Sequence, residues 1–114
     1  MRISLQIETH DRRLGLDMAG IENRLTSGTV VDIPGGAKLQ YKGSLGQKAL
    51  GIPEVLEFIL DTSVNIDLGL LSAWLYDKVK GKEVDRIMIN RRVITEISEQ
   101  GIRQVIEEEI QRSE

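Results

Sequence analysis

The chain of 114 residues has no cysteine and a single histidine. Without cysteine it cannot form a disulfide, a thiolate nucleophile or a cysteine-based zinc site. The lone His10 cannot supply a multi-histidine zinc site, and it would have to be the base of any serine–histidine pair. Because His10 ends the first expected strand, where exposed polar residues are ordinary, we expect no catalytic, cofactor-binding or metal-binding residues and no enzymatic activity.

Aromatic residues and long apolar runs are also scarce. Aromatics make up 4% of the chain, so we expect an aliphatic core with Trp74 as its one large aromatic side chain. No apolar run reaches the ~20 residues that span a bilayer. Residues 1–10 lack the basic start and apolar centre of a secretory signal. These absences predict a cytoplasmic protein with no membrane association, and they equally fit a domain cut from a longer protein.

Net positive charge is missing as well, because the formal net charge is −3. Binding to a nucleic-acid backbone depends on positive charge. Nucleic-acid binding through Arg12, Arg13, Arg91 and Arg92 is therefore the least favoured class of function.

The first third of the chain predicts a strand, a helix and two further strands. Residues 2–8 alternate apolar with polar side chains, which is typical of a strand with one buried face. Residues 11–25 carry a helical stripe, with Asp11 as the expected N-cap. Residues 29–33 and 37–41 are expected to be short strands around the turn Pro34-Gly35-Gly36.

Residues 42–51 form a Gly-rich segment that we expect to be flexible. The segment does not match the GxxxxGK[ST] pattern of a phosphate-binding loop, because Gln47 stands where the second glycine is required. If the segment nevertheless binds an anion, Lys42 and Lys48 are the candidate residues.

The second half predicts a helix, a helix, a hairpin and a helix. Apolar residues at i, i+3, i+4, i+7 and i+8 favour a helix over residues 52–60. A second helix over 68–79 follows, and residues 86–90 and 92–97 alternate as two strands around Asn90-Arg91. Ser98 is the expected cap of the last helix, whose consecutive residues Glu107, Glu108 and Glu109 are expected to form a solvated acidic face.

These elements predict one α+β domain over residues 1–114. Its small mixed or antiparallel sheet should form a single layer with helices packed on one face, because an apolar helix stripe needs a surface to cover. The C-terminal hairpin should join the same sheet as strand 2–8, with the last helix following it.

The order of these segments resembles a known family. The second of the expected helix pair carries the step Ala73-Trp74-Leu75, followed by the charged pair Asp77-Lys78, a basic break and a hairpin. Together with the first strand and the turn Pro34-Gly35, this arrangement resembles, over roughly residues 1–97, the effector-associated constant component family of bacterial conflict systems. The resemblance implies an accessory, non-enzymatic role in a multi-component signalling or defence system, and it brings no catalytic residue.

Two classes of function follow. The first is a protein–protein interaction module that binds a protein partner or forms a homo-oligomer. Its candidate interface is the apolar stripe of the last helix, Ile102, Val105, Ile106 and Ile110. Packing of that stripe on the chain's own sheet is the simpler arrangement. The second class is a small ligand- or nucleotide-binding domain, or an enzyme, that uses the segment 42–51 with Lys42 and Lys48.

Overall fold

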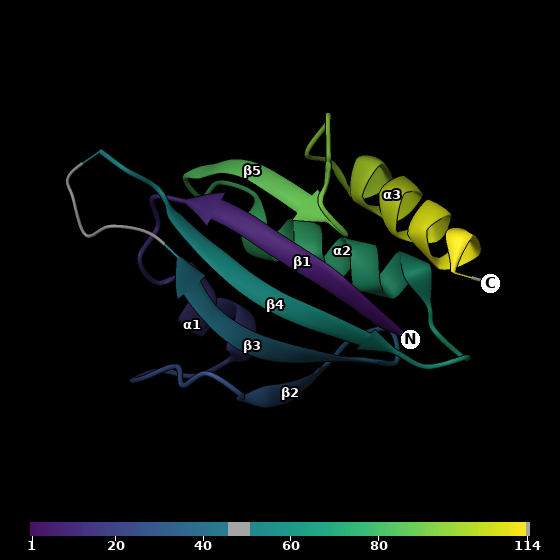
Figure 1. The fold of residues 1–114 in the computed structure, drawn as a ribbon, viewed down its shortest axis with the longest axis horizontal. Coiled ribbons are helices and arrows are strands. Elements are labelled where there is room, and N and C mark those ends of the chain that lie inside the picture. The colour runs from purple at the N-terminus through teal and green to yellow at the C-terminus, as the bar shows by residue number, and fades with distance from the viewer. Residues whose placement is uncertain (46–50, 114) are drawn as a thin grey trace.

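A six-stranded antiparallel sheet organises the protein, in the strand order β2-β3-β4-β1-β5-β6 (Figure 1). The computed structural model describes residues 1–45 and 51–113. The strands are β1 (Arg2–Thr9), β2 (Val30–Ile33), β3 (Ala37–Leu45), β4 (Glu54–Thr62), β5 (Val84–Ile89) and β6 (Arg92–Val93). The helices are α1 (Leu14–Ala19), α2 (Leu68–Val79) and α3 (Glu99–Arg112). The fold is therefore α+β, as the sequence predicts.

Strand β1 lies in the middle of the sheet, between β4 and β5. Its residues Ile3, Leu5 and Ile7 are fully buried, while the residues between them are only partly covered. All three helices lie on the side of the sheet that receives these buried residues (Figure 1). The expected single-layer sheet with helices on one face, and with the C-terminal hairpin beside the first strand, is confirmed.

The helix expected over residues 52–60 is wrong, because these residues form strand β4. Leu56, Phe58 and Leu60 alternate into the core. Val55 and Ile59 sit on the other face, so the strand is apolar on both faces. A strand with apolar residues on both faces also matches the i, i+3, i+4 spacing of a helix. Its β-branched and aromatic residues, which favour strands, indicate the true structure better than the spacing does.

The helix expected over 11–25 is much shorter, because α1 ends at Gly20, whose φ is 67°. Its N-cap is Arg13, while the Asp11 carboxylate accepts a hydrogen bond from the Arg13 amide in the turn before the helix. Strand β3 is longer than expected and runs through a bulge between Tyr41 and Gly43. Residues 42–45 of the Gly-rich segment therefore belong to the sheet.

Both later helices begin after a capping residue, of which the sequence predicts Ser98. The Asp67 carboxylate accepts from the Leu70 amide at the start of α2, and the Ser98 hydroxyl accepts from the Gly101 amide at the start of α3. Leu71, Leu75 and Val79 of α2 are buried. Trp74 is only partly buried at the margin of the core, so it is not the central aromatic anchor that its position in the stripe predicts.

Hairpin β5–β6 forms around Asn90-Arg91, as the alternation of residues 86–97 predicts. Asn90 and Arg91 have φ angles of 51° and 66°, which place both residues in the left-handed region typical of a type I′ turn. The second strand is short, because it pairs only through Arg92 and Val93.

Candidate functional site

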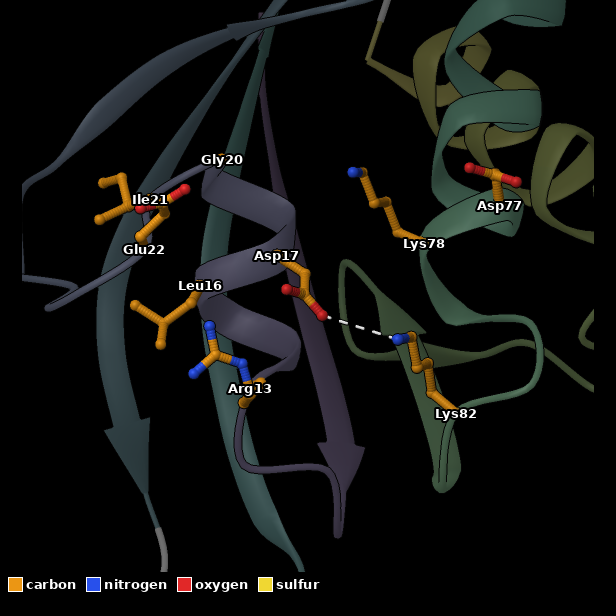
Figure 2. A pocket seen from close by; sticks show the side chains of 9 residues that line it. All are labelled: Arg13, Leu16, Asp17, Gly20, Ile21, Glu22, Asp77, Lys78 and Lys82. Atoms are coloured by element: carbon orange, nitrogen blue, oxygen red, sulfur yellow. Dashed lines mark ion pairs between the residues drawn. The ribbon is translucent and has the colours of Figure 1, made fainter.

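A cavity of about 500 Å³ lies between α1 and the C-terminal half of α2 (Figure 2). Arg13, Leu16, Asp17, Gly20, Ile21 and Glu22 line it from α1 and its flanks, and Asp77, Lys78 and Lys82 line it from α2 and the turn after it. Sequence reasoning missed this site, since nothing in the local pattern says that α1 and the end of α2 lie side by side.

The cavity has three basic and three acidic side chains in its wall. Two of the acids are paired, since Asp17 lies 3.6 Å from Lys82 and Asp77 lies 3.4 Å from Lys80. Figure 2 shows Lys78 extending toward α1, while Asp77 points away from it. Within residues 1–45 and 51–113, no carboxylate pairs with Lys78 or Arg13. The third acid, Glu22, has no cation partner among the described residues either, so Lys78, Arg13 and Glu22 are the charged groups that the cavity could offer a ligand.

His10 contacts a carboxylate, but its surroundings do not form a catalytic triad. Its Nδ1 lies 3.2 Å from an Asp85 carboxylate oxygen, and its Nε2 lies 3.5 Å from the Gly51 carbonyl oxygen. A serine nucleophile would have to lie within hydrogen-bond reach of the ring. In the described part of the chain, the hydrogen bonds of His10 include none with a serine hydroxyl. The same described part holds no group of three side chains placed to bind a metal ion.

The candidate anion-binding residues of the Gly-rich segment are not brought to the cavity. Lys42 is exposed on β3, beside the bulge, and is not among the cavity's lining residues. Lys48 lies outside the described residues, as does the rest of 46–50.

The apolar stripe of the last helix belongs to the core. Ile102, Val105 and Ile106 are buried against the chain's own core residues, and Ile110 is partly covered. Helix α3 packs on α2 and β5, where this stripe closes the end of the core. The stripe is thus already covered within the chain and presents no exposed interface through these three side chains.

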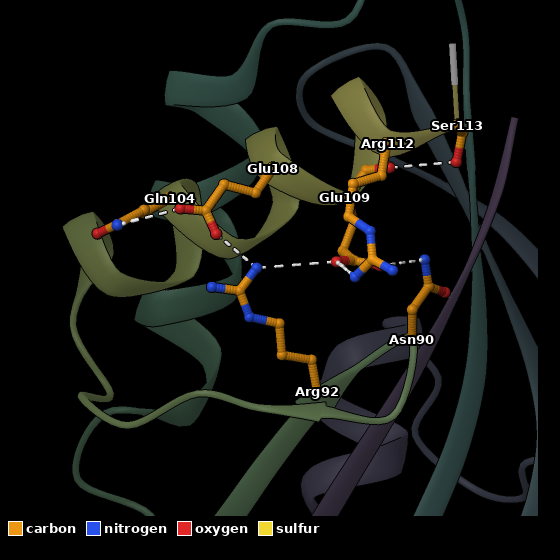
Figure 3. A network of polar contacts seen from close by, with 7 residues as sticks. All are labelled: Asn90, Arg92, Gln104, Glu108, Glu109, Arg112 and Ser113. Carbon is orange, nitrogen blue, oxygen red and sulfur yellow. Dashed lines mark hydrogen bonds and ion pairs between the residues drawn. The ribbon is translucent and has the colours of Figure 1, made fainter.

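A buried carboxylate fastens α3 to the hairpin (Figure 3). Glu109 is 7% exposed, and it accepts a hydrogen bond of 3.1 Å from the Asn90 side-chain amide. Arg112 and Arg92 lie 3.4 Å and 3.8 Å from its other oxygen. The Asn90 side chain also accepts from the Ser4 amide, so one residue links β1, the turn and α3. The expected solvated acidic face is wrong at Glu109, because it turns inward.

Glu108 stands beside this network at the surface. The hydrogen bond from Gln104 and the hydrogen bond and charge of Arg92 together lower the pKa of the Glu108 carboxyl below its ordinary value of 4.5. Arg92 is therefore held between two carboxylates (Figure 3).

The sheet face opposite the helices is open, and its polar groups are largely paired with one another. Cross-strand contacts join Arg86 to Glu8 and Gln6 to Glu57 on this face. Exposed apolar side chains lie toward its margins, at Val30, Leu45 and Val93. A polar, solvated face is ordinary for an antiparallel sheet that buries its other side. The exposed apolar side chains at the margins are what distinguishes this face.

Comparison with known proteins adds no neighbour to these observations. No family model, curated protein or solved structure matches the chain. No helix in the described ranges has both the length and the apolar character needed to cross a membrane.

Proposed function

We propose that the protein is a non-enzymatic accessory module that acts in the cytoplasm by binding other proteins, as part of a multi-component signalling or defence system in bacteria. The observation that carries the proposal is the one-sided helix layer. Because all three helices cover one face of the sheet, the other face and the outer edge of β2 stay accessible, with Val30, Leu45 and Val93 exposed at the margins. Protein interfaces combine apolar side chains with polar ones, and this face and its margins offer both.

The resemblance to the effector-associated constant component family supports the same proposal. It rests on the first strand, the turn Pro34-Gly35, the hairpin and Ala73-Trp74-Leu75, which lies in α2, whereas the first helix of the expected pair is strand β4. In that family the implied role is accessory, so the partner is expected to be encoded close to this chain.

Pairwise binding to the products of the adjoining genes tests the proposal. Each purified product would be titrated against the chain by biolayer interferometry, and Val93→Glu on the open face should weaken the binding at least about tenfold, as a buried charge at an interface does. Leu70→Glu is the matched control, because Leu70 is similarly exposed but lies on α2 in the helix layer. No saturable binding to any product, or equal effects of the two variants, would contradict the proposal.

A second candidate function is the binding of a small anionic ligand, which the α1–α2 cavity favours through Lys78 and Arg13. Isothermal titration calorimetry with a panel of nucleotides and phosphorylated metabolites tests this candidate. It also tells whether the ligand binds in the cavity or at the Gly-rich segment. Loss of binding in Lys78→Ala assigns the ligand to the cavity, whereas loss in Lys42→Ala or Lys48→Ala assigns it to the Gly-rich segment.

A further inference from the structure

The outer edge of β2 has unpaired backbone groups in a defined pattern. The Tyr41 amide donates to the Thr29 carbonyl at 2.8 Å, just beyond the pair Val30–Gln40. Hydrogen-bonded and non-hydrogen-bonded pairs alternate along an antiparallel ladder. It follows that Val31 and Ile33 bond to β3, while Val30 and Asp32 direct their amides and carbonyls away from the sheet.

Little protects this edge. No backbone hydrogen bond from elsewhere in residues 1–45 and 51–113 reaches the outward groups of β2. Val30 is 52% exposed, and the strand contains neither a lysine nor a bulge, which are the usual devices against edge pairing. The protective features that it does have are its short length and one exposed charged side chain, Asp32. At the other edge of the sheet, β6 offers only two residues.

We infer that β2 pairs antiparallel with β2 of a second copy of this chain, about a two-fold axis that passes through Val31. This inference rests on the proposed protein-binding role and names a partner for it. Two conditions select the register. Residues that stand opposite each other must place their side chains on the same face of the sheet, and the outward-pointing backbone amides and carbonyls of one strand must meet those of the other. Centring on Val31 meets both, because Val30 then stands opposite the partner's Asp32 and exchanges hydrogen bonds with it.

The alternative registers fail on charge, on the pleat or on hydrogen bonding. A centre at Val30 would set Asp32 opposite the partner's Gly28, whose amide already donates to the Tyr41 carbonyl, so only the Val30 pair would exchange hydrogen bonds. A centre at Asp32 would set two carboxylates directly opposite one another, which is unfavourable. A centre between Val31 and Asp32 would set a core-facing side chain opposite an open-face one. In the register at Val31, each Asp32 faces a valine, and its own Lys38 stays 3.8 Å away. The charges of the edge are therefore compatible with self-pairing in the register centred at Val31.

The pairing joins two sheets into one continuous sheet with both helix layers on the same side. Two strands of four residues bury much less than the ~1,200–2,000 Å² of a stable complex, so the association should be weak. Sedimentation velocity over protein concentrations from about 1 μM to 1 mM should show a reversible monomer–dimer equilibrium. A chain that stays monomeric throughout overturns the inference.

Charge at position 30 tests the register. Val30→Asp places a carboxylate opposite the partner's Asp32 twice by symmetry, and should weaken dimerisation at least about tenfold. Val30→Lys places an ammonium opposite the same Asp32 and should leave dimerisation unchanged or strengthen it. Val30 is half exposed, so circular dichroism should show both variants folded. Equal weakening by both substitutions overturns the register.

The absence of cysteine makes crosslinking a second test of the register. Two copies of Val31→Cys would meet at the axis in a non-hydrogen-bonded pair, where Cα atoms are about 4.5 Å apart and a disulfide can form. Two copies of Val30→Cys would lie diagonally, about 7–8 Å apart. Mild oxidation should crosslink the first variant much faster than the second, and the reverse order overturns the inference.

The outcome is separable from that of the proposed function. If the chain is monomeric but binds a neighbouring gene product with sensitivity to Val93→Glu, the self-pairing is wrong and the proposed function stands. If the chain dimerises as described but no gene product binds, the self-pairing stands and the accessory role in a multi-component system is contradicted.

Discussion

Glu109 is the residue whose environment differs most from what its local sequence indicates. It follows two other glutamates in a helix, and yet it is the one that is buried and shared between Asn90, Arg92 and Arg112. A buried carboxylate is tolerated when charged and hydrogen-bonding partners surround it. Removing it leaves the Asn90 amide and Arg112 without this acceptor, while Arg92 keeps Glu108.

We therefore expect Glu109→Ala to lower the free energy of unfolding by about 1.5–3 kcal/mol, which is typical of hydrogen bonds to charged groups. Urea denaturation followed by circular dichroism measures the change. Glu107→Ala, two residues away on the exposed side of α3, is the control and should have little effect. Equal losses in the two variants would mean that the Glu109 network does not stabilise the fold.

Glu108 gives the protein a modest pH dependence. Its pKa is lowered in the folded state by Gln104 and Arg92, so the ionised form is favoured by folding. The resulting stability is present above pH 4.5 and is lost as the pH falls through the lower folded-state value. In urea titrations below pH 4.5, Glu108→Gln should flatten the decline in stability. An unchanged pH profile would show that Glu108 does not contribute.

Among the elements, the β5–β6 hairpin shows strain that a substitution can relieve. Arg91 is exposed and has a φ of 66°, a conformation that costs a non-glycine residue about 1–2 kcal/mol. Arg91→Gly should therefore raise the free energy of unfolding by about 1 kcal/mol, since Asn-Gly is the preferred pair for this turn. Thermal unfolding measures the gain. Arg91→Ala keeps the strained backbone and should give none, so a gain there would point to the lost charge instead.

Helix α3 begins with a close contact that only glycine permits. A Cβ at Gly101 would overlap the Glu96 carbonyl oxygen, which belongs to the backbone and cannot rotate aside. We expect Gly101→Ala to lower the free energy of unfolding by about 1–3 kcal/mol, as overpacking does. Gly69→Ala in α2 is the comparison, because its nearest contact is the Asp67 side chain at 3.3 Å. A chemical denaturation series in which Gly69→Ala is the more damaging would contradict the close contact.

At the scale of the whole molecule, α3 completes the core. Ile102, Val105 and Ile106 are buried, and the surface of α2 and β5 beneath them would otherwise face water. A chain ending at Ser98 should therefore lose cooperative unfolding and its dispersed NMR spectrum. A chain ending at Arg112 keeps the stripe and should remain folded. A folded chain ending at Ser98 would show that α3 is an attachment to an independent core.

The sequence predicts those parts of the molecule that local chemistry controls. Alternation locates β1 and β5, Ser98 begins α3, and Asn90-Arg91 makes the hairpin turn. Sequence reasoning fails for β4, because a strand with apolar residues on both faces lacks the alternation of apolar and polar residues that identifies a strand. It also fails for the cavity and for Glu109, since both depend on which distant segments the tertiary fold brings together.

The central place of β1 also governs how the chain reaches its folded state. The first strand to be synthesised bonds on both sides to strands that come much later, and its Ser4 amide meets Asn90, 86 residues away in sequence. Ile3, Leu5 and Ile7 must stay uncovered on the nascent chain until β4 and β5 have emerged. Contacts between such distant residues make folding slow, on the order of milliseconds to seconds. Throughout that interval the uncovered apolar residues of β1 favour aggregation.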